Sequence, residues 1–471
     1  MIADLKPYPA YKDSGVEWLG QVPAHWEVRR MKSSVCERCE KGFPDEPLLA
    51  ATQTKGVVCK DRYENRTVLA INNLHLLKLV HVGDFVISLR SFQGGIEYAR
   101  EQGIISPAYT IFYPIRQEIH AFLTWLFKSQ PYIENLSLFV TGIRQGQNID
   151  YEKLSRSSLS LPPLPEQSAI VCYLNCMDRR IRLYIRAQEK LIKLLEEQKQ
   201  AIIHQAVTRG LDPNVRLKPS GVEWIGEIPE HWTVRQIKWC ASINPSKREA
   251  HEFLKPETPV TFLPMERIGT DGKIDTREIL NAHNIWNGFT YFRRGDILVA
   301  KITPCFENGK GACLTSLPTE IGFGSTEFHV LRAKSSILPQ FLYRLTLAKK
   351  FRQLGADAMT GAAGQQRVPQ IFIANYSIPV PPILEQSAIV HYLDKKTEDI
   401  ALLLSSTRKK ISLLREYRTR LIADVVTGKL DVREIAARLP EEAEEIEESE
   451  ISDSEELPEN EGSVPDLDFH N

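Results

Sequence analysis

Two long stretches of the chain carry apolar residues at heptad spacing and contain neither glycine nor proline. One begins at Glu166 and the other at Glu385, and each continues for about 40 residues. Apolar residues that recur every three or four positions predict a helix with one apolar seam, as in a coiled coil. We therefore predict helices over residues 166–208 and 385–427, each ended by a glycine that follows it.

The two predicted helices belong to a longer internal repeat. The repeated phrases are "SGVEWLGQVPAHW" (14–26) and "SGVEWIGEIPEHW" (220–232), and the repeated hinges are "PPLPEQSAIVCYL" (162–174) and "PPILEQSAIVHYL" (381–393). Each half of the chain contains a phrase, a variable segment, a proline hinge and a long helix. A repeat of this kind predicts two copies of one architecture, related by an internal pseudo-twofold axis.

The two helices are expected to pair with each other. At 1.5 Å per residue, each is about 60 Å long, which is more than its own variable segment can cover. Because a whole domain separates the helices in sequence, we predict an antiparallel coiled coil. The alternative is that each helix packs separately on its own domain.

The variable segments share an order of elements although their residues differ. Each has a Gly-Asp turn that leads into an apolar strand, a second strand after a serine, an amphipathic helix and a loop rich in glycine and glutamine. The predicted helices are "EIHAFLTWLFKSQPYIENL" (118–136) and "ILPQFLYRLTLAKKFRQLG" (337–355). This mixture predicts an α/β or α+β domain in each half.

We divide the chain into seven parts on these patterns. They are an N-terminal segment (1–26), a first domain (27–161), a central helix (162–212), the second copy of the phrase (213–232), a second domain (233–380), a C-terminal helix (381–432) and a tail (433–471).

The charge of the chain is unevenly distributed. The net charge is −1, but residues 441–471 contain 14 Asp and Glu and no Lys or Arg, which leaves about +13 on residues 1–440. A basic body with an acidic tail indicates a protein that binds a polyanion, with a disordered tail that competes weakly for the basic face. The alternative is a solubilising tail beside an ordinary surface.

Composition narrows the class of protein further. No run of about 18 uncharged apolar residues is present, so no membrane helix is expected. The first residues lack the apolar core of a secretory signal, and the eight cysteines show no regular framework. We therefore expect a cytoplasmic protein with reduced thiols.

Motifs of catalysis are missing from the sequence. It has no nucleotide-binding glycine loop, no His-Glu-x-x-His helix and no Gly-x-Ser-x-Gly turn, and the one Cys-x-x-Cys (36–39) has no matching pair. We predict no catalytic residue and no metal site. The His-Trp pairs that end the repeated phrases are interpreted as buried anchors. Glu166 and Glu385 are interpreted as carboxylates that favour the helix dipole.

The loops that follow the strands are the candidate DNA-binding surface. Gln and Asn pair with adenine, Arg pairs with guanine, and glycine lets backbone amides approach phosphates. The candidates in the first domain are Arg90, Gln93, Arg144, Gln145, Gln147 and Asn148, and those in the second are Lys301, Asn308, Lys310, Gln365, Gln366 and Arg367. The alternative for each is an ordinary solvated loop residue.

The repeated phrases, the "LPPLPEQ" and "VPPILEQ" hinges and the duplicated helices together resemble the DNA-specificity subunit of type I restriction–modification systems. The resemblance covers about residues 8–432. It implies two target-recognition domains (27–160 and 233–380), held apart by the helices, that read an asymmetric, bipartite site in double-stranded DNA. It also implies a subunit without a catalytic centre in a complex that methylates adenine and restricts unmodified DNA in the prokaryotic cytoplasm.

The resemblance further implies the partners of the chain. Two methyltransferase subunits would bring S-adenosylmethionine, and restriction subunits would bring ATP and Mg²⁺, so this chain would bind no cofactor itself. Two other classes remain open from the residues alone. One is a coiled-coil assembly protein that does not read DNA, and the other is an enzyme that acts by itself.

Overall fold

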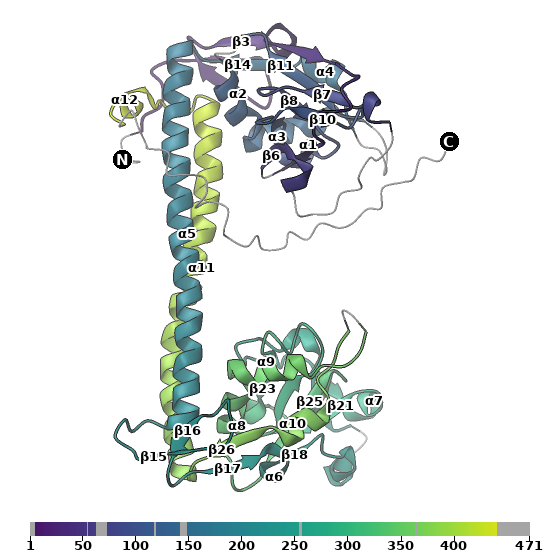
Figure 1. The fold of residues 1–471 in the computed structure, drawn as a ribbon, viewed down its shortest axis with the longest axis vertical. Coiled ribbons are helices and arrows are strands. Elements are labelled where there is room, and N and C mark those ends of the chain that lie inside the picture. The colour runs from purple at the N-terminus through teal and green to yellow at the C-terminus, as the bar shows by residue number, and fades with distance from the viewer. Residues whose placement is uncertain are drawn as a thin grey trace. The chain divides into compact units, whose positions relative to one another are not determined.

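The computed structural model forms two compact units that share the two long helices (Figure 1). Unit 1 combines residues 1–186 with 411–471, and unit 2 is the continuous stretch 187–410. The structure describes residues 5–53, 55–62, 73–116, 119–141, 148–253, 257–362 and 365–439. The mixed helix-and-strand class predicted for each half is confirmed.

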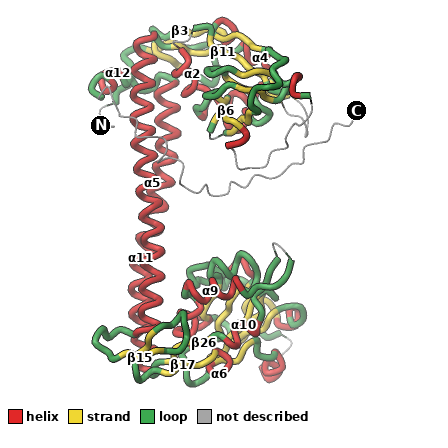
Figure 2. Tube along the Cα trace, viewed as in Figure 1, coloured by secondary structure: helices red, strands yellow, loops and turns green. Residues whose placement is uncertain are grey.

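The predicted antiparallel pairing of the helices is confirmed. Helix α5 spans Leu164–Arg209 and helix α11 spans Ile383–Val426, so both begin two residues earlier than predicted. In unit 1 the first part of α5 packs beside the last part of α11, with Ile181 and Leu421 in one core. In unit 2 the last part of α5 runs beside the first part of α11 (Figure 2). Leu195 packs there with Ile400 and Leu404.

Each domain is built around a four-stranded antiparallel sheet of the same order. In unit 1 the order is β4 (Val35–Arg38), β11 (Thr110–Pro114), β8 (Phe85–Ile87) and β9 (Glu97–Tyr98). In unit 2 it is β18 (Ala241–Ile243), β25 (Phe328–Ala333), β22 (Ile297–Ala300) and β23 (Gly311–Cys313). The Gly-Asp turns lead into β8 and β22, as predicted.

Short strand pairs join each domain to the start of its long helix. They are β3 (Glu27–Arg30) with β14 (Ser158–Leu161) and β17 (Thr233–Gln236) with β26 (Ser377–Val380), both antiparallel. Unit 2 contains a further sheet of β20 (Ile279–Asn281), β19 (Pro259–Leu263), β24 (Ile321–Gly324) and β21 (Thr290–Arg293), in which β19 and β24 are parallel. Unit 1 has two corresponding strand pairs, β5 (Leu49–Thr52) with β6 (Gly56–Cys59) and β10 (Gly103–Ile105) with β7 (Lys78–Val80), and a parallel bridge between Leu48 and Ile104 joins them.

The amphipathic helix predicted in each domain is in fact two helices. In unit 1 these are α2 (His120–Phe127) and α3 (Gln130–Leu136), and in unit 2 they are α8 (Pro339–Thr346) and α9 (Lys349–Asp357). The backbone is extended between the members of each pair, with ψ of 142° at Ser129 and 135° at Ala348. Apolar spacing continues through such a break, so the sequence pattern did not reveal it.

The boundary of the C-terminal tail also differs from the prediction. The first residues assigned to the disordered tail are folded, because α12 (Arg433–Ala436) packs Ala436 into the core of unit 1. Arg433 also lies 5.2 Å over the ring of Tyr8. The whole acidic segment, residues 441–471, lies outside the described residues. Within the part of the chain that is described, no helix is long and apolar enough to cross a membrane.

Candidate nucleic-acid interface

The repeated phrase and the repeated hinge meet at the start of each long helix. Trp26 and Trp232 are fully buried, and their indole nitrogens donate to Glu166 at 2.6 Å and to Glu385 at 2.9 Å. The preceding histidines approach the same carboxylates, each through Nε2 at 2.6 Å. The tryptophans are therefore the predicted buried anchors. The histidine side chains are instead 40% and 46% exposed.

The two carboxylates differ in how deeply they are buried. Glu166 is 4% exposed and accepts a third hydrogen bond, from the hydroxyl of Tyr8 at 2.6 Å, whereas Glu385 is 41% exposed. Burial and the adjacent Glu166 carboxylate raise the pKa of the Tyr8 hydroxyl. Both carboxylates thus have a specific structural role beyond the helix dipole. The sequence signal for this role was the paired repetition of His-Trp and Glu.

The glutamine of each hinge fixes the prolines before it. The side-chain amide of Gln167 donates to the carbonyl oxygen of Pro162 at 2.7 Å, and that of Gln386 donates to Pro381 at 2.8 Å. The carbonyls of Pro163 and Pro382 accept from backbone amides of the helix, and the glutamine side chains supply donors to the preceding carbonyls of Pro162 and Pro381. Together the glutamate and glutamine hold each domain in a fixed orientation on the first turn of its own helix.

The predicted DNA-contacting residues of the second domain surround the loop between β22 and β23. Lys301 and Lys310 lie at the two ends of this loop, and the Ala300 amide donates to the Lys310 carbonyl at 3.0 Å. Asn308 is exposed near the tip. The loop therefore presents one amide and two ammonium groups from a rigid base.

The loop that contains Gln365, Gln366 and Arg367 joins the first loop directly. The carbonyl oxygen of Gln366 accepts from the amide of Thr303 at 3.0 Å and from its hydroxyl at 2.9 Å. The structure thus brings the predicted residues of the second domain together on neighbouring loops. Arg367 forms two hydrogen bonds of 2.9 Å with Glu327, so its guanidinium is already paired with a carboxylate.

The predicted residues of the first domain are described only in part. Arg90 and Gln93 are exposed where β8 leads into the short helix α1 (Ser91–Gly94). Asn148 begins β13 (Asn148–Ile149), and its side-chain oxygen accepts from the amide of Ile149 at 2.9 Å. The other three candidates, Arg144, Gln145 and Gln147, lie outside the described residues.

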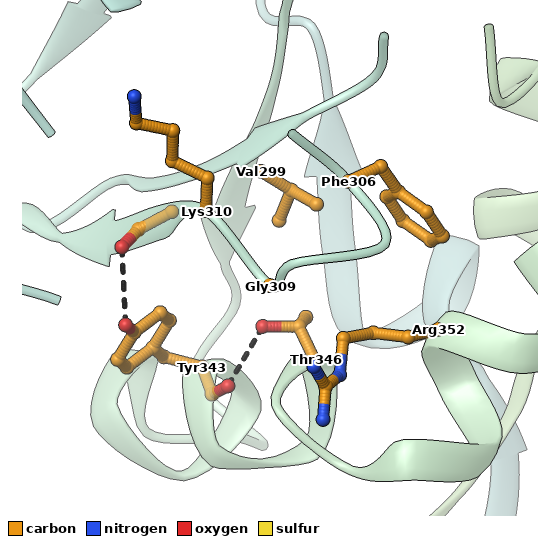
Figure 3. A pocket seen from close by; sticks show the side chains of 8 residues that line it. Val299, Phe306, Gly309, Lys310, Tyr343, Thr346 and Arg352 are labelled. Carbon is orange, nitrogen blue, oxygen red and sulfur yellow. Dashed lines mark hydrogen bonds between the residues drawn. The ribbon is translucent and has the colours of Figure 1, made fainter. Parts of the chain in front are cut away.

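Sequence reasoning missed a cation that holds the loop of the second domain. Arg352, on α9, donates from Nη1 to the carbonyl oxygen of Glu307 at 3.2 Å and packs on Gly309 (Figure 3). The backbone at Gly309 has a φ of +71°, and a Cβ there would lie 3.3 Å from the Arg352 side chain. The cavity at this contact has a volume of about 10 Å³, which is room for about one water.

Metal-binding groups are also lacking among the residues that the structure describes. No three His, Cys, Asp or Glu side chains there are placed to hold a metal ion. Cys36 and Cys39, the members of the single Cys-x-x-Cys, are both exposed thiols. The interface therefore offers amides, guanidinium groups and ammonium groups, which are the donors that recognise nucleic acids.

Two similar mixed domains that share a pair of antiparallel helices form a fold with a counterpart among solved structures. A solved structure described as "Structural basis underlying complex assembly and conformational transition of the type I R-M system" matches with a TM-score of 0.61. That match has 17% identity and covers 86% of this chain and 98% of that one. Residues 267–411 match the family model described as "Type I restriction modification DNA specificity domain".

Named relatives of the chain come from the same family. The chain is 36% identical over 209 residues to the Type I restriction enzyme EcoEI specificity subunit of Escherichia coli, covering 44% of this chain and 34% of that protein. It is 36% identical over 204 residues to the EcoAI specificity subunit of the same species, covering 43% and 33%. These matches span about a third of the length of those two relatives, and they confirm the resemblance seen in the sequence.

Proposed function

We propose that this chain is the DNA-specificity subunit of a type I restriction–modification complex. It binds double-stranded DNA at an asymmetric, bipartite sequence and directs adenine methylation, and restriction of unmodified DNA, by its partner subunits. The observation that carries the proposal is the contrast between the two domains. In both domains a His-Trp pair and a Glu-Gln pair at matching positions attach the domain to its helix, whereas the loops that offer amides and cations differ.

Each domain would read one half-site. Gln366 and Asn308 in the second domain, and Gln93 and Asn148 in the first, supply amides that can pair with adenine edges. Lys301 and Lys310 supply ammonium groups for phosphates or guanine. Because the loops differ between the domains, the two half-sites would differ in sequence. The paired helices would set the length of the unread spacer between them.

The methyltransferase and restriction subunits would carry out the chemical reactions. S-adenosylmethionine would be bound by two methyltransferase subunits, and ATP and Mg²⁺ by restriction subunits, with the whole complex in the prokaryotic cytoplasm. Surface composition supports docking, because the helices expose leucines that a lone coiled coil would not need. Leu194 on α5 is 52% exposed, and Leu402 and Leu403 on α11 are 66% and 54% exposed. Exposed apolar clusters of this kind mark protein interfaces.

The same leucines favour a second candidate function, an assembly protein that does not read DNA. The two functions are separated by mapping methylated adenines across a host genome that expresses this chain with its neighbouring methyltransferase subunit. An interrupted, asymmetric motif that is methylated only when this chain is present supports the specificity function. Absence of new methylation, with the methyltransferase shown to be folded and bound, supports the assembly function instead.

A further inference from the structure

Positive charge is concentrated in the second domain. Residues 233–380 contain 19 Lys and Arg against 12 Asp and Glu, a net charge of +7, whereas residues 27–161 contain 17 against 14, a net charge of +3. A difference of this size between two copies of one architecture raises the question of where the additional cations lie.

One cation in each domain holds the loop that follows strand β8 or strand β22. In unit 1, Lys128 donates to the carbonyl oxygen of Gly94 at 2.9 Å, and it also forms an ion pair with Glu97 at 2.6 Å. In unit 2, Arg352 holds the corresponding loop through the carbonyl of Glu307. The position that matches Glu97 in the strand register is Ala312. Among the residues that the structure describes, no carboxylate pairs with Arg352, and burial lowers the pKa of its guanidinium.

Further cations lie around Arg352 without carboxylate partners. Lys349 and Lys350 are exposed in the first turn of α9, and Lys199 is half-buried on the facing helix α5. We call these three lysines and Arg352 the α9 patch. No carboxylate of the described residues lies within ion-pair distance of any of them. Asp271 and Glu196 act on Lys199 only at longer range, and each pairs with another cation.

Repulsion between the like charges around this patch lowers the pKa of two neighbouring side chains. The pKa of Lys199 is lowered by burial and by Arg344 and Arg352, and the pKa of His204 is lowered by burial and by Arg209 and Lys350. Like charges gathered without counter-ions repel one another and slightly destabilise the folded chain. A polyanion bound over these cations would relieve the repulsion. Such an arrangement is complementary to a row of phosphates, which lysine and arginine bind without regard to base sequence.

We propose that the α9 patch binds backbone phosphates of duplex DNA beside the recognition loops of the second domain. This inference rests on the proposed function, because it presupposes that the chain binds DNA. It adds that the two domains contribute unequally. The second domain supplies more of the salt-dependent affinity, while the first domain, whose loop cation Lys128 lies 2.6 Å from the Glu97 carboxyl, relies more on base contacts.

The test compares the full chain with a triple variant, K349Q/K350Q/R352Q. Binding to a fluorescent duplex that contains the methylated motif, and to one of unrelated sequence, is measured at several salt concentrations. Loss of three phosphate contacts should flatten the plot of log Kd against log salt by about 2.7 units and weaken binding to unrelated DNA at least tenfold at about 50 mM salt. In the double variant K349Q/K350Q, which leaves the contact between Arg352 and the loop intact, the base preference of each half-site should stay the same.

Three controls keep the outcome decisive. The variant K238Q/K273Q/R277Q removes the same charge from other surfaces of the second domain and should leave the slope nearly unchanged. The double variant K349Q/K350Q preserves the Arg352 contact with the loop and should give about two thirds of the effect. The variant R352K keeps the charge and should retain the slope even if the loop loosens.

The possible results separate the two proposals. A triple variant that binds with wild-type slope and affinity, or a double variant K349Q/K350Q that alters base preference instead, overturns the α9 patch alone. A wild-type chain that shows no sequence-dependent and no salt-dependent binding overturns the proposed function, and the patch with it. A slope that falls equally in the surface control also overturns the patch, because charge anywhere on the domain would then suffice.

Discussion

The indole nitrogen of Trp26 donates to a carboxylate oxygen of Glu166 across 2.6 Å, although 140 residues separate them in the chain. The same bond recurs between Trp232 and Glu385, at 2.9 Å. Each bond connects the end of a repeated phrase to the start of a long helix, with a whole domain between them. The domain is thereby closed at its base, and its variable loops can change without loss of this attachment.

The two copies of this bond should differ in strength. Glu166 is buried and accepts from Tyr8, His25 and Trp26, so E166A leaves several donors unsatisfied and should cost about 3 kcal/mol. E385A should cost about 1 kcal/mol, because that carboxylate is 41% exposed and water can replace it. Urea denaturation gives the free energies, and hydrogen exchange in the two phrases assigns each loss to its unit. Equal losses would contradict the difference in burial.

Glu97 should make unit 1 sensitive to pH. Burial raises the pKa of Glu97 to about 7, although Lys128 offsets part of the shift. Between pH 4.5 and 7 the folded chain therefore binds more protons than the unfolded chain. The stabilising contribution of this group is fully present below about pH 4.5 and is lost as the pH rises through 7. Its size is about 3 kcal/mol.

The variant E97Q isolates this contribution. The difference in unfolding free energy between E97Q and the wild-type protein should move by about 3 kcal/mol in favour of E97Q between pH 4.5 and pH 8. The control E134Q changes an exposed glutamate on α3 and should show no such trend. A flat difference for E97Q would mean that Lys128 keeps the carboxylate ionised throughout.

Gln366 should specify one base pair of the second half-site. Its backbone carbonyl is held by Thr303, so its side chain is presented from a fixed point. An amide that pairs with adenine contributes about 1–3 kcal/mol of discrimination, so Q366A should relax the sequence at one position of that half-site. Methylation mapping reads the outcome directly. Q353A, exposed on α9, is the control, and a change in the first half-site would contradict the assignment of one domain to each half-site.

Docking of the partner subunit should depend on the exposed leucines of α11. L402D/L403D places two charges where the partner would bury apolar surface, and should abolish co-purification with the methyltransferase subunit. Its thermal unfolding should stay near that of the wild-type protein, because both leucines are exposed. The neighbouring exposed pair gives the matched control, S405D/S406D, which adds the same charge. If both variants still bind, the docking surface lies elsewhere.

Helix length should set the unread spacer. Insertion of four residues after Arg186 in α5, and of four after Lys410 in α11, adds about 6 Å and about one helical turn. Both helices must be extended because they pack antiparallel within each unit. The methylated motif should retain both half-sites and gain about one or two base pairs between them. A new half-site sequence would show that the helices do more than separate the domains.

Local sequence patterns predicted the long helices and the turns before β8 and β22 well, because each of these features occurs twice in the sequence. Heptad spacing gave both long helices to within two residues at their starts, and the Gly-Asp turns located β8 and β22. The interpretation of the tryptophans as buried anchors was right, because an aromatic side chain repeated before a domain has packing as its main role. The bond from each tryptophan to a carboxylate was missed, since 140 and 153 residues separate the partners.

The candidate interface was predictable only in part. Residue chemistry predicted Lys301, Asn308, Lys310 and Gln366 as contact residues, and the structure places them on adjoining loops, but their contact with DNA stays a prediction. It could not show that Arg367 is paired with Glu327, because that ion pair depends on a strand 40 residues earlier. It also passed over Arg352, since a cation on the polar face of a predicted helix looks like any solvated residue until its counter-ions are counted.

The division of the chain between the two units determines the order in which a ribosome can complete them. Unit 2 is one continuous stretch, but unit 1 needs residues 411–426 to cover the apolar face of α5. At about 5–20 residues per second, the intervening 220 or so residues take on the order of 10–45 s to synthesise. Throughout that interval Ile170, Tyr173 and Ile181 await their partners on α11. Unit 1, which is synthesised first, is therefore completed last. The nascent chain exposes the apolar face of α5 until α11 has been synthesised.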